Sequence, residues 1–196
     1  MKVKAALVVT VAGALLMGSM FSVGPVWAAK KEATKAQKQA EVRKTVNETL
    51  NRLYKLQPTS KEAIERAAGY AVFSNFGMKI FFAGGGSGKG IAVNNATKKE
   101  TFMKMVEVQA GLGMGVKKFR LVWVFQTEEA LNTFISSGWE LGSQATAAAQ
   151  YDAKGVGLAG AVAVSKGVWL YQLTDDGLAV ELTAKGTKYY KDDDFN

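Results

Sequence analysis

The spacing of apolar residues predicts helices near the start of the chain. Between residues 30 and 55 the chain is polar, and its apolar positions recur at mixed steps of three and four residues. This spacing predicts an amphipathic helix with a weak start and a stronger end, which Pro58 terminates. The segment Thr59-Ser-Lys-Glu62 then has the pattern of a capping box, which predicts a short second helix ending at Ala68.

Runs typical of strands replace the helical spacing from Tyr70 to Phe125. They occupy residues 70–73, 79–82, 90–93, 101–108 and 119–125, with a turn within residues 94–99. Because these runs follow one another with little room for crossover helices, we expect the strands to pair mainly antiparallel.

The last third of the chain mixes both kinds of element. Thr127, followed by two glutamates, is typical of a helix start, and this helix should end near Gly138. The other predicted elements are residues 144–149, ambiguous between helix and strand, a buried strand at 156–164, and strands at 168–173 and 178–183 around the hairpin turn Asp175-Asp176-Gly177. Together the elements predict a single α+β domain, with N-terminal helices packed on a strongly curled, mainly antiparallel sheet or partial barrel.

Glycine occupies every second position in three stretches. These are Gly84, Gly86, Gly88 and Gly90, then Gly111, Gly113 and Gly115, and finally Gly155 and Gly157. Alternate residues of a strand share a face, so each stretch predicts a face almost without side chains. Glycine weakens a strand, and the usual reasons for its presence are sharp curvature or close approach by another backbone, a helix or a ligand.

The first glycine stretch does not form a phosphate-binding loop. Ala83 stands where that motif requires its first glycine, and Gly90 replaces the Ser or Thr that would bind magnesium after Lys89. No parallel βαβ pattern surrounds the segment either. A tight β-turn with Lys89 exposed is the simpler interpretation of this segment.

The first 28 residues are typical of a secretory signal peptide. Lys2 and Lys4 precede an apolar run over residues 5–21, and Val26-Trp27-Ala28 supplies a cleavage site after Ala28. An uncleaved membrane anchor is the alternative, because the run approaches the ~20 residues that span a bilayer. We expect an exported protein, periplasmic or envelope-associated, with a basic helical leader at residues 29–57 and one domain at residues 58–196.

Composition removes most enzymatic chemistry. The chain has no cysteine and no histidine, which excludes disulfides, thiolate metal sites, Ser-His-Asp and Cys-His catalysis, and lipid attachment through a cysteine. The acidic pairs fit a helix start and a turn, and residues 192–194 fit a solvated tail better than a cation site. We predict no catalytic residue, metal or cofactor.

Removal of the signal peptide lowers the formal net charge from +8 to +6, which suits an anionic membrane surface or an acidic ligand without requiring either. Lys117, Lys118 and Arg120 adjoin the second glycine stretch, and with Lys89 they form a candidate lipid-binding patch; ordinary solubilising charge at strand ends is equally compatible. The basic start of the first helix permits a membrane-surface helix, although its alanine-only apolar face favours a solvated helix or a frayed leader. Trp123, Trp139 and Trp169 lie in apolar runs and are predicted core residues.

Six segments of the chain resemble the SYLF lipid-binding domain in order and spacing. They are AGYAVF at 68–73, GGGSGKG at 84–90, GLGMGV at 111–116, LVWVF at 121–125, SGWE at 137–140 and the closing KGTKYYKDDDFN at 185–196. The resemblance covers about residues 60–196 and implies a lipid-binding module, not an enzyme. Eukaryotic members bind phosphoinositides and act with actin at membranes, partly through an N-terminal amphipathic helix. Bacterial members are exported, often as lipoproteins, and Lys89 lies in the family's GKG motif.

We therefore expect non-catalytic, reversible binding to an anionic phospholipid membrane surface in the cell envelope. Since the chain has no lipidation cysteine, the contact must come from the domain or from the helix at residues 30–55. The alternative is a structural or protein-interaction module of the envelope without specific lipid binding. Nucleic acid is not an expected partner of an exported chain.

Overall fold

The computed structural model describes residues 33–80, 83–110, 115–141, 158–179 and 187–196, and at 75–80, 83–85, 107–110, 115–118 and 141 it describes the backbone only. Ala33–Asn196 forms one compact unit. The helices are α1 (Lys35–Leu56), α2 (Thr59–Arg66) and α3 (Glu128–Ser136). The strands are β1 (Gly69–Ile80), β2 (Ala83–Asn94), β3 (Glu100–Ala110), β4 (Gly115–Phe125), β5 (Trp139–Leu141), β6 (Val162–Ser165), β7 (Val168–Thr174), β8 (Gly177–Ala179) and β9 (Thr187–Lys191).

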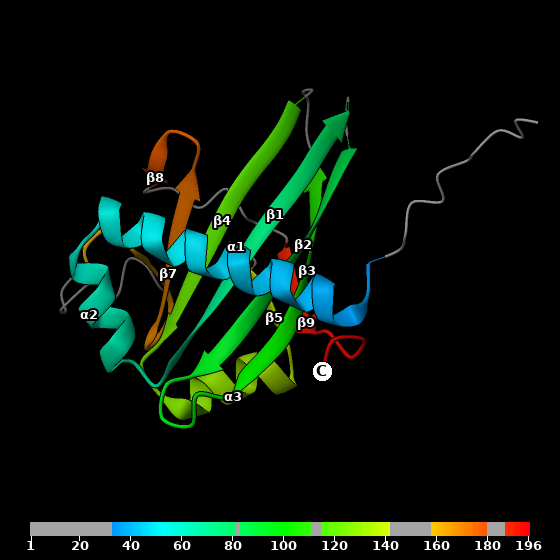
Figure 1. Cartoon of the computed structure of the whole chain (residues 1–196). Coiled ribbons are helices and arrows are strands. Elements are labelled where there is room, and N and C mark those ends of the chain that lie inside the picture. The colour runs from blue at the N-terminus through cyan, green and yellow to red at the C-terminus, as the bar shows by residue number, and fades with distance from the viewer. Residues whose placement is uncertain (1–32, 81–82, 111–114, 142–157, 180–186) are drawn as a thin grey trace, which may run out of the picture. The chain divides into compact units, whose positions relative to one another are not determined.

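The strands form one antiparallel sheet in the order β5-β9-β3-β2-β1-β4-β7-β6, with β8 paired to β7. Figure 1 shows α1 lying across one face of this sheet, with α3 at one end of the strands. The predicted α+β architecture with a curled antiparallel sheet is confirmed. Within the described ranges, no helix is long and apolar enough to cross a membrane.

Aromatic contacts show how strongly the sheet curls. Tyr189 of β9 and Trp123 of β4 are separated by three strands in the sheet order, a path of roughly 19 Å in a flat sheet. Their ring centroids are only 5.0 Å apart. The sheet therefore closes around these rings as a half-barrel. We call the face that carries these rings the inner face, and the face under α1 the outer face.

Each face of the sheet has its own core. On the inner face, α3 adds Leu131 and Phe134 to a cluster that contains Phe73 and Trp123. On the outer face, α1 buries one side of the helix against Val72, Ile91 and Val122, through Val42, Val46, Leu50 and Leu53. The predicted core role of Trp123, Trp169 and Trp139 is confirmed, since the first two are buried and Trp139 packs against the inner cluster.

Two glycines of the first stretch explain the curvature of the inner face. A Cβ at Gly90 would lie 2.5 Å from Phe73 Cδ1, and one at Gly88 would lie 2.7 Å from Met105 Cγ. The absent side chains therefore leave the room into which the inner-face side chains pack. Gly84 and Gly86 occupy the same face of β2, and Gly115 pairs with Lys79. Gly111, Gly113, Gly155 and Gly157 lie outside the described residues.

Several predicted boundaries are wrong, because pairing with neighbours overrides local pattern. The GGGSGKG segment is not a turn, since β2 begins at Ala83 and stays in register with β1 from there to Asn94. The run at 70–73 and the described part of the run at 79–82 belong to the single strand β1. Pro58, not Thr59, caps α2, and the predicted capping box is absent there. A capping box does open α1, where Thr34 and Gln37 exchange bonds.

The C-terminal elements follow the prediction more closely. Thr127 caps α3 by accepting a bond from the Ala130 amide, and β7 and β8 form the hairpin around Asp175 and Asp176. The buried strand predicted at 156–164 is shorter in its described part, where only β6 is a strand and Gly160, with φ +79°, lies in the turn before it. Residues 144–149 lie outside the described residues.

Candidate functional site

The sheet register aligns basic residues on the outer face. Lys104 of β3 pairs with Lys89 of β2, Lys89 pairs with Ser74 of β1, and Ser74 pairs with Arg120 of β4. Directly paired residues share a face, and Val72 and Ile91 place this row on the face under α1. Lys89 is exposed and Arg120 is half-buried. The row thus brings two of the four predicted lipid-binding residues onto one surface.

The other two predicted residues lie further along β4, where the backbone alone is described. Lys118 pairs with Phe76 and is two positions from Arg120, so it occupies an outer-face position. Lys117 pairs with Gly77 and occupies a position of the inner face. The register therefore groups Lys89, Lys118 and Arg120 and separates Lys117 from them.

Lys89 is in contact with the C-terminal segment. Its Nζ lies 3.6 Å from the centroid of the Phe195 ring and 3.9 Å from Asp192 Oδ2. The ammonium therefore combines a cation–π contact with an ion pair longer than a hydrogen bond. About half of the Lys89 side chain, 46%, remains exposed. Its charge is partly balanced from one side and open to solvent on the other.

The C-terminal segment is packed through Asp192 and Phe195, so the prediction of a solvated acidic tail is wrong for Asp192, whereas Asp193 and Asp194 are exposed as predicted. Asp192 is only 1% exposed, and its Oδ1 lies 2.9 Å from Lys104 Nζ, which also lies 2.7 Å from Asp194 Oδ2. The hydrogen bonds to Asp194 and Asp192 raise the pKa of Lys104, and the Lys104 bond lowers the pKa of the exposed Asp194 carboxyl. Lys89 and Lys104 therefore compensate the negative charge of Asp192, which would otherwise favour exposure of the segment to water.

Hydrophobic and backbone contacts complete this packing. Phe195 meets Phe102 edge-on at 5.7 Å, and the Asn196 side chain donates to the Phe102 carbonyl at 2.9 Å. Gln39 and Lys35 of α1 donate to the carbonyls of Phe195 and Asn196. The segment thus ties the start of α1 to the sheet. Phe195, an aromatic residue at the end of an acidic run, was the sequence signal for this packing.

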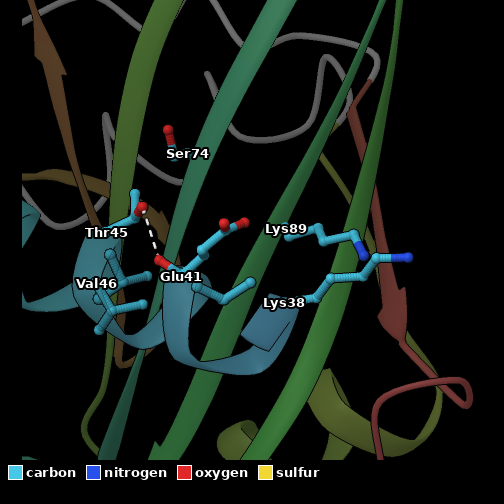
Figure 2. Close-up of a pocket in the computed structure, with 8 residues that line it drawn as sticks. Lys38, Glu41, Thr45, Val46, Ser74 and Lys89 are labelled. Atoms are coloured by element: carbon cyan, nitrogen blue, oxygen red, sulfur yellow. Dashed lines mark hydrogen bonds between the residues drawn. The ribbon is translucent and has the colours of Figure 1, made fainter. Parts of the chain in front are cut away.

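A pocket of about 290 Å³ lies between α1 and the row of basic residues. Figure 2 shows its polar lining, with Lys38, Glu41 and Thr45 contributed by α1 and Ser74 and Lys89 by the sheet. Val42, Val46 and Val72 supply its apolar lining. Sequence reasoning missed this pocket, because its walls come from segments that meet only in the fold.

Two large apolar side chains are exposed on the outer face of the sheet, the face that also carries the pocket. Val106 is 39% exposed and Tyr190 is 42% exposed. Val106 pairs with Ser87 and Tyr190 with Lys104, so both occupy the outer face. We call the surface formed by Lys89, Val106, Arg120 and Tyr190 the outer-face patch. Among the residues that the structure describes, no group of three or more Asp or Glu side chains is arranged to hold a metal ion.

Comparison with known proteins identifies similar chains. The model of the Ysc84 family, described as Las17-binding protein actin regulator, matches residues 106–196. The chain is 30% identical over 145 residues to Beta cell expansion factor A from Aeromonas veronii. This match covers 74% of the present chain and 54% of the relative, so the chain spans about half the length of that protein.

Proposed function

Because the protein carries a domain of the Ysc84 (SYLF) family, which is associated with lipid binding and is generally non-catalytic, we propose that it binds anionic phospholipid membranes without chemical turnover. The proposed location is the cell envelope of an exported protein. The observation that carries the proposal is the outer-face patch, where basic and exposed apolar side chains lie on one surface.

The outer-face patch has the composition that a lipid–water interface favours. A cation near an anionic membrane surface contributes about 1 kcal/mol, and an exposed tyrosine combines an apolar ring with a polar tip. Arg120 and Lys89 supply the charges, Lys118 occupies the next outer-face position of β4, and Val106 and Tyr190 supply apolar area. Such a surface supports reversible adsorption.

We assign the proposed membrane contact to the sheet and not to α1. The apolar side of α1 is already buried against Val72, Ile91 and Val122. Inserting that side into a membrane would require the helix to leave the sheet and expose this core to water. Deleting α1 is therefore an unsuitable test of its lipid binding, because the deletion would also destabilise the fold.

The test is co-sedimentation with vesicles of phosphatidylglycerol and phosphatidylcholine, compared with pure phosphatidylcholine vesicles. The variant carries Lys89→Gln, Lys118→Gln and Arg120→Gln, the three predicted lipid-binding residues that the register places on the outer face. We expect its affinity for the anionic vesicles to fall by about 2–3 kcal/mol, roughly 30- to 150-fold, with the lower value reflecting the partial neutralisation of Lys89. Added salt should weaken binding of the unmodified protein through screening.

A matched control removes the same charge from other surfaces. Lys55, Lys61 and Lys99 are exposed residues of α1, α2 and the loop before β3. Their joint replacement by Gln should leave most of the vesicle affinity intact. Equal losses in both variants would mean that net charge alone drives binding. If the unmodified protein does not bind the anionic vesicles, the proposal fails and the envelope-interaction alternative takes its place.

A further inference from the structure

The pocket beneath α1 has the dimensions of a small polar ligand. Its volume of about 290 Å³ is at the lower end of the roughly 300–1,000 Å³ of ligand pockets, which leaves room for a lipid headgroup but not for acyl chains. Val42 and Val46 on the helix and Val72 on β1 give it an apolar wall. The remaining lining residues carry ammonium, carboxylate and hydroxyl groups.

The charges that line the pocket sum to one positive charge. Lys38 and Lys89 each contribute an ammonium group, and Glu41 contributes a carboxylate. In Figure 2 both lysine side chains extend to the same side of the pocket, away from Ser74 and Thr45. The Asp192 oxygen lies 3.9 Å from Lys89 Nζ, beyond hydrogen-bond distance, so this ammonium retains donors for another oxygen. At the lysine end of the pocket Asp192 offsets part of the Lys89 charge, so this end complements an anion of low charge.

Glu41 restricts which anion the pocket accepts. An ionised carboxylate accepts hydrogen bonds and repels a bare phosphate, so it favours a ligand that also carries a donor. Figure 2 shows the Glu41 carboxylate between Thr45 and Lys89. The Thr45 hydroxyl donates to the Glu41 carbonyl at 3.0 Å, which leaves the Thr45 oxygen as a second acceptor. Hydroxyl groups on the ligand could therefore donate hydrogen bonds to the Glu41 carboxylate and to the Thr45 oxygen.

We propose that this pocket binds the headgroup of one phospholipid, a monoanionic phosphodiester with free hydroxyl groups, of which phosphatidylglycerol is the representative. The phosphate lies at the Lys38 and Lys89 end, and a headgroup hydroxyl donates to Glu41. A zwitterionic amine headgroup brings no net negative charge to the lysine end. Phosphatidic acid lacks the alcohol hydroxyls of the glycerol headgroup, and its second ionisation brings more negative charge close to Glu41. This assignment rests on the proposed membrane function and adds lipid selectivity to it.

The test uses soluble short-chain lipids below their micelle concentration, titrated calorimetrically into the full chain. The ligands are dihexanoyl phosphatidylglycerol, phosphatidic acid and phosphatidylcholine, with inorganic phosphate as a further arm. We expect the unmodified protein to bind phosphatidylglycerol about tenfold more tightly than phosphatidic acid or phosphatidylcholine, the equivalent of one well-placed hydrogen bond to a charged group. Inorganic phosphate should bind more weakly than any anionic lipid.

Glu41→Gln is the decisive variant, because it keeps the shape of the side chain and removes its charge. It should reduce the preference for phosphatidylglycerol over phosphatidic acid about fivefold or more, while Lys38→Gln should weaken both lipids together. Glu48→Gln is the matched control, since Glu48 is an exposed residue of the same helix that does not line the pocket. The thermal midpoint of each variant establishes that it is folded.

Three results would overturn the assignment. They are equal affinity for phosphatidylglycerol and phosphatidic acid, a preference that Glu41→Gln leaves unchanged, and phosphate binding as tight as that of phosphatidylglycerol. Binding to anionic vesicles without binding to monomeric lipid would reject the pocket and leave the proposed membrane function standing. Absence of binding to both would reject the membrane function as well.

Discussion

Replacing Gly90 by alanine tests whether the curl of the sheet depends on its bare inner face. The added Cβ would lie 2.5 Å from Phe73 Cδ1 and 2.8 Å from Phe73 Cγ, about 1 Å inside ordinary contact, and it would also press on the Val72 carbonyl oxygen. Phe73 is fully buried, and its ring contacts Tyr189 at 4.9 Å and Phe134 at 6.1 Å. Displacement of the buried Phe73 ring would therefore disturb its packing against these two rings.

The expected cost follows from these contacts. Overpacking a core costs about 1–3 kcal/mol, and the backbone oxygen places Gly90 toward the upper end of this range. Alanine regains about 0.5–1 kcal/mol from the lower flexibility of the unfolded chain. We therefore expect a net loss of about 2 kcal/mol, which lowers the thermal midpoint of a domain of this size by roughly 4–8 °C.

Thermal melting followed by near-ultraviolet circular dichroism measures this loss. Ser87→Ala is the control, since Ser87 is an exposed outer-face residue of the same strand, and its effect should stay within about 0.5 kcal/mol. Phe73→Leu should partly relieve the clash, so the double variant Gly90→Ala/Phe73→Leu should be more stable than additivity predicts by about 1 kcal/mol. An unchanged midpoint for Gly90→Ala, or strict additivity, would refute the packing argument.

Three further predictions concern other parts of the chain. The mature protein should begin at Ala29 and be recovered outside the cytoplasm; mass spectrometry that finds residues 1–28 intact would contradict cleavage. Asp192→Asn should speed amide hydrogen exchange in residues 192–196 and in the first turns of α1, because the ion pair with Lys104 holds both, while exchange in β1 stays unchanged. Burial raises the pKa of Tyr54 and of Tyr171 from 10.0 to about 12, so stability that is complete below pH 10 should be lost as the pH rises through about 12. The difference in tyrosinate absorbance between the unmodified protein and a Tyr54→Phe/Tyr171→Phe variant reports these two groups, and a difference that rises near pH 10, before unfolding, would contradict this.

Local pattern determined the elements whose information lies within a few residues. Thr127 caps α3 because its hydroxyl reaches an amide three residues on, and the Asp175-Asp176-Gly177 hairpin depends on its own backbone conformation, with Gly177 at φ +131°. The alternating glycines likewise predicted a strand face without side chains, and the described pair Gly88 and Gly90 confirms close packing there. These features can be predicted from residues that are close together in the sequence, without knowing which distant residues pack against them.

Tertiary structure alone decided which of the predicted site residues share a surface. Lys117 and Lys118 are neighbours in sequence, yet the strand alternation assigns them to opposite faces once the register with β1 is known. Lys89 meets Asp192 and Phe195 across about a hundred residues of chain, and the pocket under α1 joins a helix to two strands. Hydrophobic periodicity shows which face of a single helix or strand is buried. The strand register, the curl of the sheet and the ion pairs depend instead on which distant element packs against that face. The composition of the chain therefore indicated a basic protein without cysteine or histidine chemistry, and only the packing of α1 and the C-terminal segment against the sheet assembled its candidate site.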